Sequence, residues 1–558
     1  MNKIAMLLIS GFALGFTPNF TNVLAFGETA LPTPSAIGEK RPNILVIMAE
    51  DMSSKVGAFG DAVAVTPNLD KLAAQGVRFS NVYTTAGVCA PSRASHITGM
   101  HQISLGGQHM RSGNFKGQKY LAVPPPEVKA YPELLRRAGY YTFTNRKLDY
   151  QFSSIMSGSG PFTVWDDDGP NPDWNLRASD QPFYGLINLL ITHESQLFQK
   201  NIERNRSRGL EKIVSADQVV VPPYYPDTLI VREAIAQQYD NIHAMDKQVG
   251  DLIAKLQADN IADNTIVIWT TDHGDGLPRG KRELYDSGLK VPMIIHWPER
   301  LRPSAFKNGD IDRRLISFVD FAPSVLQVAG VPIPDYVHGT TTLFDKGVVR
   351  DYVYAAKDRM DEFPFRERAI RDHRFKYIYN YQPDKPGAVH LRYRDQLSIM
   401  EDLWSQYEKG SLNNEQAFWF QPRPEHEFYD LENDPHEVNN LADNPDYKLE
   451  RLRLSGQLKQ RMLTVGDLSD QSELELAQQF WPQGIQPKTT APRLELIGKS
   501  TVKLIPVEPN SSIGYRFDGG QWLAYQPDSL IAVPNSAKLE VKAVRYGWSE
   551  SDTVYKTF

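Results

Sequence analysis

The chain has 558 residues, of which 41% are hydrophobic and 23% are charged, with 25 Tyr and 25 Phe available to build cores. This length predicts three or four folding units, and the composition excludes intrinsic disorder, a coiled coil and collagen. The formal net charge of −6 gives no bulk basic character, so we expect no nucleic-acid partner. An anionic substrate would need cations gathered locally in one pocket.

The first residues are typical of a signal peptide. Lys3 supplies a positive charge, an apolar stretch follows at 4–16, and Val23-Leu24-Ala25 fits a cleavage site. We expect residues 1–25 to be removed on export to the periplasm or the medium, leaving 26–40 as a linker. The alternative is an N-terminal membrane anchor, but the apolar run is shorter than the ~20 residues that a spanning helix needs. No later stretch approaches ~18 consecutive apolar residues, so we expect no membrane partner after cleavage.

Alternating strand and helix signals occupy residues 41–365, which are predicted to form the main domain. In chain order they predict a strand at 43–48, a helix at 66–76, a helix at 132–138, a strand at 140–144, a helix at about 228–257 and a strand at 265–269. Such alternation predicts an α/β fold with a mostly parallel sheet and helices on both faces. Ligands bind beyond the carboxyl ends of such strands, where Glu50-Asp51 and Asp272-His273 lie.

The pattern of predicted strands and helices changes after the main domain. A smaller α+β subdomain is predicted at 366–485, with a strand hairpin at about 369–379 and a helix at about 447–463. A polar, proline-containing linker leads to residues 493–558, whose short alternating strands predict a small β-sandwich-like accessory domain. We expect this domain either to bind substrate or to pack against the rest of the protein.

The chain has a single cysteine, Cys89. An exported protein normally carries an even number of cysteines, paired as disulfides. A lone thiol in an oxidising compartment is a liability unless it is buried or chemically converted. The count alone favours a buried, inert cysteine, but the neighbouring residues favour conversion.

Residues 89–99 read Cys-Ala-Pro-Ser-Arg-Ala-Ser-His-Ile-Thr-Gly. Pro91 suits a first helical turn and Gly99 suits the far end, so Cys89 is predicted at a helix N-terminus, where backbone amides favour an anion. Arg93 lies four residues on, over the same face, so its guanidinium can reach what Cys89 holds. The segment closely resembles the sulfatase signature, Cys-x-Pro-Ser-Arg followed five residues later by Thr-Gly.

The resemblance to formylglycine-dependent sulfatases implies that a formylglycine-generating or sulfatase-maturating enzyme oxidises Cys89 to formylglycine (3-oxoalanine). The aldehyde hydrates to a gem-diol, one hydroxyl of which attacks the sulfate group. The second hydroxyl lets the resulting ester collapse, which releases inorganic sulfate and restores the aldehyde. The resemblance covers roughly residues 41–445 and implies the alkaline-phosphatase-like α/β/α sandwich, with 41–365 as the catalytic domain.

The resemblance also implies a metal ion. Residues 41–46, which lead to Glu50-Asp51, resemble the family's first metal motif, and Asp272-His273 resemble the second. The implied ligands are Glu50, Asp51, Cys89, Asp272 and His273. The family normally binds calcium, which suits carboxylate oxygens, but more often has two consecutive Asp residues where this chain has Glu50-Asp51. Adjacent strand residues point to opposite faces, so joint ligation requires the backbone to leave the strand there.

Further cations are implied to complete the pocket. Residues 280–292 are similar to the family segment Gly-Lys-x-x-x-Tyr-Glu-Gly-Gly-x-Arg-Val-Pro, whose lysine, here Lys281, binds sulfate and the leaving-group oxygen. Lys147 follows a segment that resembles Gly-Tyr-x-Thr, whose lysine binds sulfate. Asp149 stands where the family has a His implicated in sulfate release. His193, within Thr-His-Glu-Ser, resembles a substrate-binding His and is a candidate general acid.

Three residues are predicted to bind substrate. His109 follows the signature helix, in Gly-Gly-Gln-His-Met-Arg, and the sequence leaves open whether or not it lines the pocket. Asp149 is a candidate because of its place in the Lys147 segment. Arg279, within Leu-Pro-Arg-Gly-Lys, lies in a segment that resembles the sulfamidase-like branch of the family. Cleavage of an N-sulfate therefore stays open beside cleavage of an O-sulfate.

Three functions remain open. The first is an exported sulfuric ester hydrolase that acts on a sulfated polysaccharide or its oligosaccharides. The second is a phosphonate monoester or phosphodiester hydrolase, because a few relatives use the same nucleophile on phosphorus. The third is a non-catalytic protein that binds sulfated glycans, which is disfavoured because the nucleophile, the arginine and the metal ligands are all present.

Overall fold

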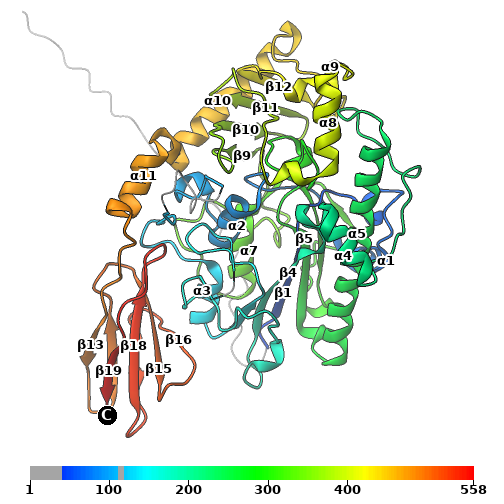
Figure 1. Ribbon diagram of the computed structural model, residues 1–558. Coiled ribbons are helices and arrows are strands. Elements are labelled where there is room, and N and C mark those ends of the chain that lie inside the picture. Colours follow the sequence, from blue (N-terminus) through cyan, green and yellow to red (C-terminus); the bar gives the residue numbers. More distant parts are fainter. Residues whose placement is uncertain (1–39, 111–118, 157) are drawn as a thin grey trace, which may run out of the picture. The chain divides into compact units, whose positions relative to one another are not determined.

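The computed structural model describes residues 40–110, 119–156 and 158–558, drawn as the coloured ribbon in Figure 1. The predicted signal peptide at 1–25 lies outside the described residues, as does all but the last residue of the predicted linker at 26–40. Among the helices of the described segments, none is both long and apolar enough to cross a membrane.

The main domain is built on one eight-stranded sheet. Its strands are β1 (Asn43–Ala49), β2 (Val77–Tyr83), β3 (Tyr141–Thr144), β4 (Phe183–Leu189), β5 (Thr265–Thr271), β6 (Lys290–His296), β7 (Ile311–Asp312) and β8 (Ile316–Ser317). The order is β3-β4-β1-β5-β6-β2-β7, with β8 also paired to β2. The β6 strand is antiparallel to its two neighbours, and the other pairs are parallel. The predicted mostly parallel sheet is therefore confirmed.

Helices cover both faces of this sheet. The helices of the described residues are α1 (Pro67–Gln75), α2 (Cys89–Thr98), α3 (Tyr131–Arg137), α4 (Gln199–Ser207), α5 (Leu229–Ala258), α6 (Asp286–Leu289), α7 (Phe321–Val328), α8 (Ser398–Glu408), α9 (Asn414–Ala417), α10 (Lys448–Val465) and α11 (Glu473–Phe480). Figure 1 shows α2, α3 and α7 on one side of β1 and α1 and α5 on the other. The helices predicted at 66–76, 132–138 and 228–257 correspond to α1, α3 and α5.

After Asn43, the β1 strand is apolar at every position because both of its faces are buried. Ile44 and the alternate residues after it belong to the core that α2, α3 and α7 share. Leu45 and its alternates belong to the core that α1 and α5 share. Since successive side chains point to opposite faces, a strand between two helix layers needs apolar residues at every position. This packing fixes the strand end, where the polar residues begin.

The smaller subdomain contains a four-stranded antiparallel sheet of β9 (Val353–Lys357), β10 (Glu367–Arg371), β11 (Phe375–Asn380) and β12 (His426–Asp430). The α10 helix packs on it through a cluster that includes Ile370, Phe428 and Leu454. The predicted hairpin and helix are both confirmed. The β9 strand pairs with β10, so this sheet begins ahead of the boundary predicted at residue 366.

The C-terminal region forms two small antiparallel sheets around one core, as predicted. Their strands are β13 (Arg493–Leu496), β14 (Thr501–Ile505), β15 (Ser512–Phe517), β16 (Leu523–Ala524), β17 (Ile531–Ala532), β18 (Lys538–Val544) and β19 (Val554–Thr557). Buried Glu133 of α3 accepts hydrogen bonds of 2.7 Å from the Tyr546 and Ser512 hydroxyls. The Tyr546 ring stacks on Phe152 with centroids 4.7 Å apart. These buried contacts favour the packing alternative for this region.

Candidate active site

The ends of β1 and β5 bring the two predicted acidic pairs together. The strands are parallel neighbours, and their last residues are paired. Glu50-Asp51 and Asp272-His273 follow directly, at the carboxyl edge of the sheet where ligands bind in such folds. The amide of Asp51 donates a hydrogen bond of 3.2 Å to Oδ1 of Asp272, which connects the two strand ends.

The backbone leaves the strand at Asp51, as joint use of two adjacent side chains requires. Asp51 has a φ of 51°, in the left-handed region. Its carbonyl accepts a hydrogen bond of 2.8 Å from the amide of Gly276. A Cβ at Gly276 would lie 3.0 Å from that of Asp51, so a larger residue would force this turn apart. The turn lets the Glu50 and Asp51 carboxylates serve one site.

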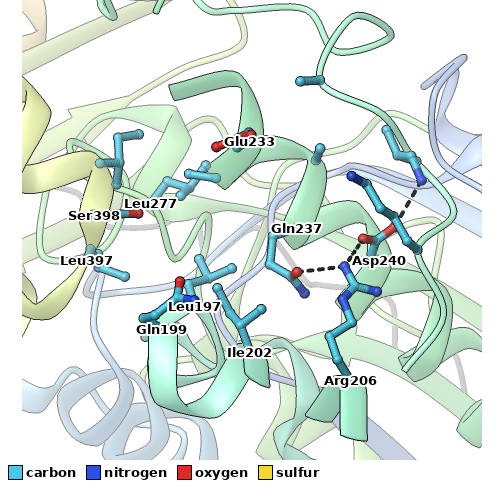
Figure 2. Close-up of a pocket in the computed structure, with 16 residues that line it drawn as sticks. Leu197, Gln199, Ile202, Arg206, Glu233, Gln237, Asp240, Leu277, Leu397 and Ser398 are labelled. Atoms are coloured by element: carbon cyan, nitrogen blue, oxygen red, sulfur yellow. Dashed lines mark hydrogen bonds and ion pairs between the residues drawn. The ribbon is translucent and has the colours of Figure 1, made fainter. Parts of the chain in front are cut away.

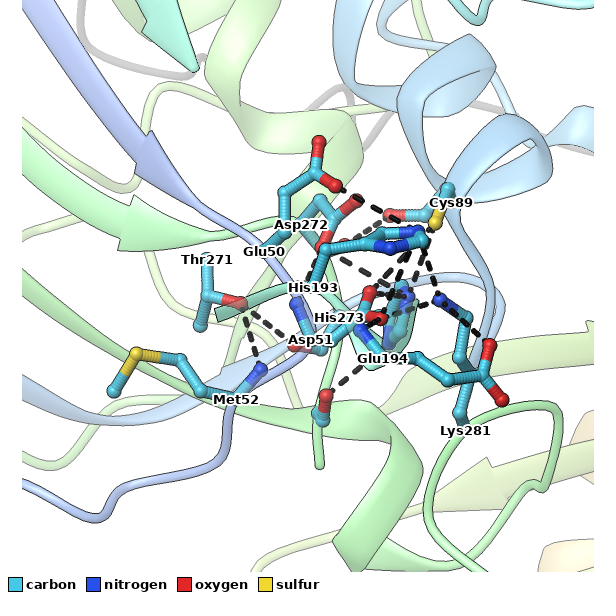
Figure 3. A network of polar contacts seen from close by, with 12 residues as sticks. Glu50, Asp51, Met52, Cys89, His193, Glu194, Thr271, Asp272, His273 and Lys281 are labelled. Atoms are coloured by element: carbon cyan, nitrogen blue, oxygen red, sulfur yellow. Dashed lines mark hydrogen bonds and ion pairs between the residues drawn. The ribbon is translucent and has the colours of Figure 1, made fainter. Parts of the chain in front are cut away.

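Cys89 is the first residue of α2, and Gly99 ends the helix with a φ of 74°, so the predicted helix N-terminus is confirmed. Its Sγ lies 3.4 Å from Nε2 of His273 and 3.7 Å from Oδ1 of Asp51. With Asp272, these residues form a buried group whose donor atoms lie within 4.8 Å of one another. Figure 3 shows the group where the strands end beside α2.

The donor atoms of this group fit a divalent cation. The Asp51 and Asp272 carboxylates supply the oxygen ligands that calcium prefers, and His273 adds an imidazole nitrogen. Burial lowers the pKa of His273, but the Asp272 and Asp51 carboxylates outweigh it and raise that pKa to about 10. In the protein alone an imidazolium thus balances the carboxylates, and binding of a cation would release its proton.

Arg93 lies one helical turn after Cys89 and is 1% exposed. Its Nε donates to Asp272 over 3.1 Å, and one Nη donates to Glu50 over 2.9 Å. The other Nη donates to Oδ1 of Asn188 over 2.6 Å. The guanidinium therefore joins the ends of β1, β4 and β5 next to residue 89.

Two buried lysines add positive charge. Nζ of Lys147 lies 2.8 Å from a carboxylate oxygen of Glu50, and Nζ of Lys281 donates to Asp51. Burial raises the pKa of the Cys89 thiol, but Lys147 and then Lys281 outweigh it and lower that pKa. The same field would attract a sulfate group placed at residue 89.

His193 caps the short 3-10 helix at 194–197. The Ser195 amide donates to its Nδ1 over 3.2 Å, so Nδ1 is an acceptor and the neutral ring carries its proton on Nε2. Nε2 lies 3.5 Å from Nζ of Lys281 and 3.9 Å from a carboxylate oxygen of Asp51. Burial, and then the charge of Lys281, lower the pKa of His193 to about 4. The ring is therefore neutral at pH 7, with Nε2 placed between the lysine and the Asp51 carboxylate.

Known proteins match most of the chain. A family model described as sulfatase matches residues 42–331. The chain is 37% identical over 556 residues to an ulvan-active sulfatase of Formosa agariphila, covering 92% of this chain and 91% of that protein. The chain belongs to the sulfatase family. It is thus a sulfatase hydrolase, as the signature predicts.

Further comparisons agree with the sulfamidase-like features of this sulfatase. A model described as the N-sulphoglucosamine sulphohydrolase C-terminal region matches residues 279–395. The chain is 24% identical over 458 residues to human N-sulphoglucosamine sulphohydrolase, covering 74% of this chain and 88% of that one. The structure of a 2-O GAG sulfatase superposes with a TM-score of 0.55 at 18% identity, over 77% of this chain and 94% of that one. The last comparison confirms the fold.

Glu50 of this sulfatase lies beside the Cys89 group. Its carboxylate binds Arg93 and Lys147, and it forms a second set of donors within 4.8 Å with Asp51 and His193. The structure thus places all five predicted metal ligands in one region. Glu50 is held there by two cations, and its role as a ligand stays a prediction.

Two of the predicted substrate-binding residues are buried. Asp149 is buried in the segment that carries Lys147. His109 is 8% exposed, and its Nδ1 lies 3.4 Å from the amide of Arg359, which can donate to it.

Arg279 has different surroundings from the other predicted residues. Its guanidinium lies over the rings of Tyr224 and Tyr285, 4.4 Å and 4.0 Å from their centroids. One Nη donates to the carbonyl of Glu437 over 2.6 Å. These contacts give Arg279 a place in packing against the smaller subdomain, and its role in substrate binding stays a prediction.

Sequence reasoning missed Asn188 and Glu194. Asn188 lies near the end of β4, a strand that was not predicted, and accepts from Arg93. Glu194 accepts two hydrogen bonds from Arg282, of 2.7 Å and 3.0 Å, while its amide donates to Asp51 over 2.6 Å. Burial raises the pKa of Glu194, but Arg282 lowers it to about 2. The rule that functional residues follow strand ends would have found Asn188, and the Thr-His-Glu-Ser segment contained Glu194.

A pocket of about 290 Å³ lies elsewhere, and Figure 2 shows it between α4, α5 and the start of α8. The residues labelled there are Leu197, Gln199, Ile202, Arg206, Glu233, Gln237, Asp240, Leu277, Leu397 and Ser398. None of the predicted site residues lines it, and Arg206 is paired with Asp240. This pocket therefore shares no residue with the Cys89 group.

Proposed function

We propose that this sulfatase is exported and hydrolyses sulfate esters on a sulfated polysaccharide or its oligosaccharides, with a formylglycine formed from Cys89 and a bound calcium ion. The observation that carries the proposal is the buried group of Asp51, Cys89, Asp272 and His273, with Arg93 and two lysines beside it. The predicted signal peptide supports export.

The substrate class rests on the relative with the highest identity reported above. The Formosa agariphila protein is described as ulvan-active, and the similarity spans nearly all of both chains. This similarity supports a sulfated polysaccharide as substrate.

The cations define where the sulfate group would bind. Asp51, Asp272 and His273 would hold a calcium ion, which would supply positive charge beside residue 89, and a hydrated formylglycine there would supply the oxygen nucleophile. Arg93, Lys147 and Lys281 supply fixed positive charge toward the sulfate oxygens in a buried setting, where electrostatic stabilisation is strong. Since these groups are already oriented by carboxylates, little reorganisation is needed when the sulfate binds.

Departure of the sugar requires a proton on its oxygen. The protonated amine of Lys281 lies 3.5 Å from Nε2 of the neutral His193 ring, and both groups are positioned by neighbouring residues. General acid catalysis by a positioned side chain typically contributes ~10²–10⁴-fold. We assign the proton donor for the leaving group to this His193–Lys281 pair.

Removal of divalent cations is expected to lower the rate of sulfate release at least about 100-fold, and calcium is expected to restore it. A ligand that binds the folded state at 100 times its Kd stabilises that state by about 2.7 kcal/mol. Calcium should therefore raise the Tm of the chelator-treated wild type but not that of Asp272→Asn. Exposed Asp263→Asn is the matched control and should respond as the wild type does. A wild type whose Tm and activity ignore both chelator and calcium would show that no such ion is used.

The matured enzyme is expected to release inorganic sulfate from ulvan oligosaccharides. Sulfate release should be measured on these and on N-sulfated oligosaccharides. The second substrate is included because residues 279–395 match the C-terminal model of N-sulphoglucosamine sulphohydrolase. Parallel assays with 4-nitrophenyl sulfate and bis(4-nitrophenyl) phosphate compare kcat/KM for hydrolysis of a sulfate ester with kcat/KM for hydrolysis of a phosphodiester. A higher kcat/KM on the phosphodiester would contradict the proposal.

A further inference from the structure

Two glutamines after α2 are equally buried but differently bonded. Gln102 and Gln108 are each 1% exposed. The Gln102 amide donates to the carbonyl of Thr85 over 2.9 Å and accepts from the Ser95 hydroxyl over 3.0 Å. Neither amide atom of Gln108 has a hydrogen-bond partner among the described residues. Gln102 is therefore satisfied within the fold, and Gln108 is not.

An unpartnered buried carboxamide opposes folding. Such a group has lost its hydrogen bonds to water without gaining others, so native proteins rarely keep one without a reason. Nε2 of the next residue, His109, is also buried and unpartnered in the described structure. Two consecutive side chains thus offer hydrogen-bonding atoms that the fold does not use.

The segment that carries these side chains runs along α2. A Cβ at Gly107 would lie 3.6 Å from that of Ala94, and Met110 shares an apolar cluster with Ala90. Ala90 and Ala94 are one helical turn apart, in the row next to Cys89 and Arg93. Residues 108 and 109 lie between these two positions and are therefore held close to α2, the helix that begins at Cys89.

The loop that contains Lys147 borders the same segment. The side-chain amide of Gln151 donates to the carbonyl of Gly107 over 3.0 Å and to that of His109. Gln108 therefore lies between the signature helix and the loop that supplies one of the sulfate-binding lysines.

We propose that Gln108, together with Nε2 of His109, binds hydroxyl groups of the sugar ring that carries the sulfate. This inference rests on the proposed function, since it concerns the sugar of the same substrate. A carboxamide offers two N–H donors and one carbonyl acceptor, which match hydroxyl groups that both accept and donate. Being neutral, it recognises the sugar and leaves charge recognition to Arg93 and the lysines.

Gln108→Met is the test, because methionine keeps the size of the side chain and removes the amide. The ratio of kcat/KM for ulvan oligosaccharides to kcat/KM for 4-nitrophenyl sulfate is expected to fall about 10- to 100-fold. The Tm is expected to stay equal or to rise, because the variant no longer buries an unpartnered amide. A residue with a merely structural role would show the opposite change in Tm.

Gln102→Met is the matched control, since it removes a buried amide that is bonded within the fold. It should lower the Tm by at least about 2 °C and leave the substrate ratio unchanged. A fall in Tm for Gln108→Met equal to that of the control, or an unchanged substrate ratio, would overturn the inference. A wild type that releases no sulfate from any saccharide would instead overturn the proposed function, and the comparison of the two Tm values would still decide whether the fold needs the Gln108 amide.

Discussion

Replacement of Cys89 by alanine is expected to lower the rate of sulfate release at least about 10⁴-fold, because it removes the side chain from which the nucleophile is made. The Tm should change little, since the thiol makes long contacts of 3.4 Å and 3.7 Å to His273 and Asp51. The rate is measured on 4-nitrophenyl sulfate and on ulvan oligosaccharides.

Mass analysis of the peptide that contains residue 89 supplies the control for maturation. Conversion to formylglycine should make the peptide about 18 Da lighter than the thiol form, or equal to it when the aldehyde is hydrated. The two forms of equal mass are separated by alkylation, which modifies the thiol alone. Activity retained by Cys89→Ala would rule out the proposed nucleophile, and full activity of a preparation that keeps its thiol would rule out the conversion.

Replacement of Arg93 by methionine is expected to damage both stability and catalysis. Arg93 compensates Glu50 and Asp272 at a site where its side chain is 1% exposed and those of the carboxylates 0%. Removing one partner of a buried ion pair typically costs about 3–5 kcal/mol, because the remaining charge has no compensation. Loss of a preorganised donor typically lowers kcat about 100- to 1,000-fold. The Tm and the rate on 4-nitrophenyl sulfate measure the two effects.

Arg374→Met is the control for Arg93→Met. Arg374 also binds a carboxylate, that of Asp430 over 2.7 Å, but its side chain is 46% exposed. Water can replace this pair, so the Tm should fall much less than for Arg93→Met. Equal falls in Tm would show that burial of Arg93 does not increase the stability lost with its ion pairs. A normal rate in Arg93→Met would remove Arg93 from the catalytic groups.

Local signals were sufficient for a large part of the fold. The apolar run at 43–48 predicts a doubly buried strand, and the α5 helix is visible in its amphipathic pattern. The helix N-terminus at Cys89 follows from Pro91 in the first turn and Gly99 just after the last one, both of them local signals. These features depend on neighbouring residues in the sequence, so the sequence is enough to find them.

The elements that escaped prediction depend on contacts between distant segments. The β4 strand pairs with β1 across more than a hundred residues, and β6 is antiparallel in an otherwise parallel sheet. No pattern of neighbouring residues in the sequence indicates the strand order or the direction of β6. Asn188 and Glu194 were missed for the same reason, since their importance lies in bonds to Arg93 and Asp51 from other parts of the chain.

Motif spacing and type of residue thus determined the family, the nucleophile at Cys89 and the cations and carboxylates expected around it. The tertiary structure decided which of these residues contact one another. Glu50 binds Arg93 and Lys147, and Asp51, Asp272 and His273 lie around Cys89. It also showed that the side-chain amide of Gln102 is hydrogen-bonded within the fold and that of Gln108 is not, a difference that composition and spacing do not indicate. The reason is physical, because hydrogen bonding and ion pairing act over a few ångströms, and only folding sets which groups come that close.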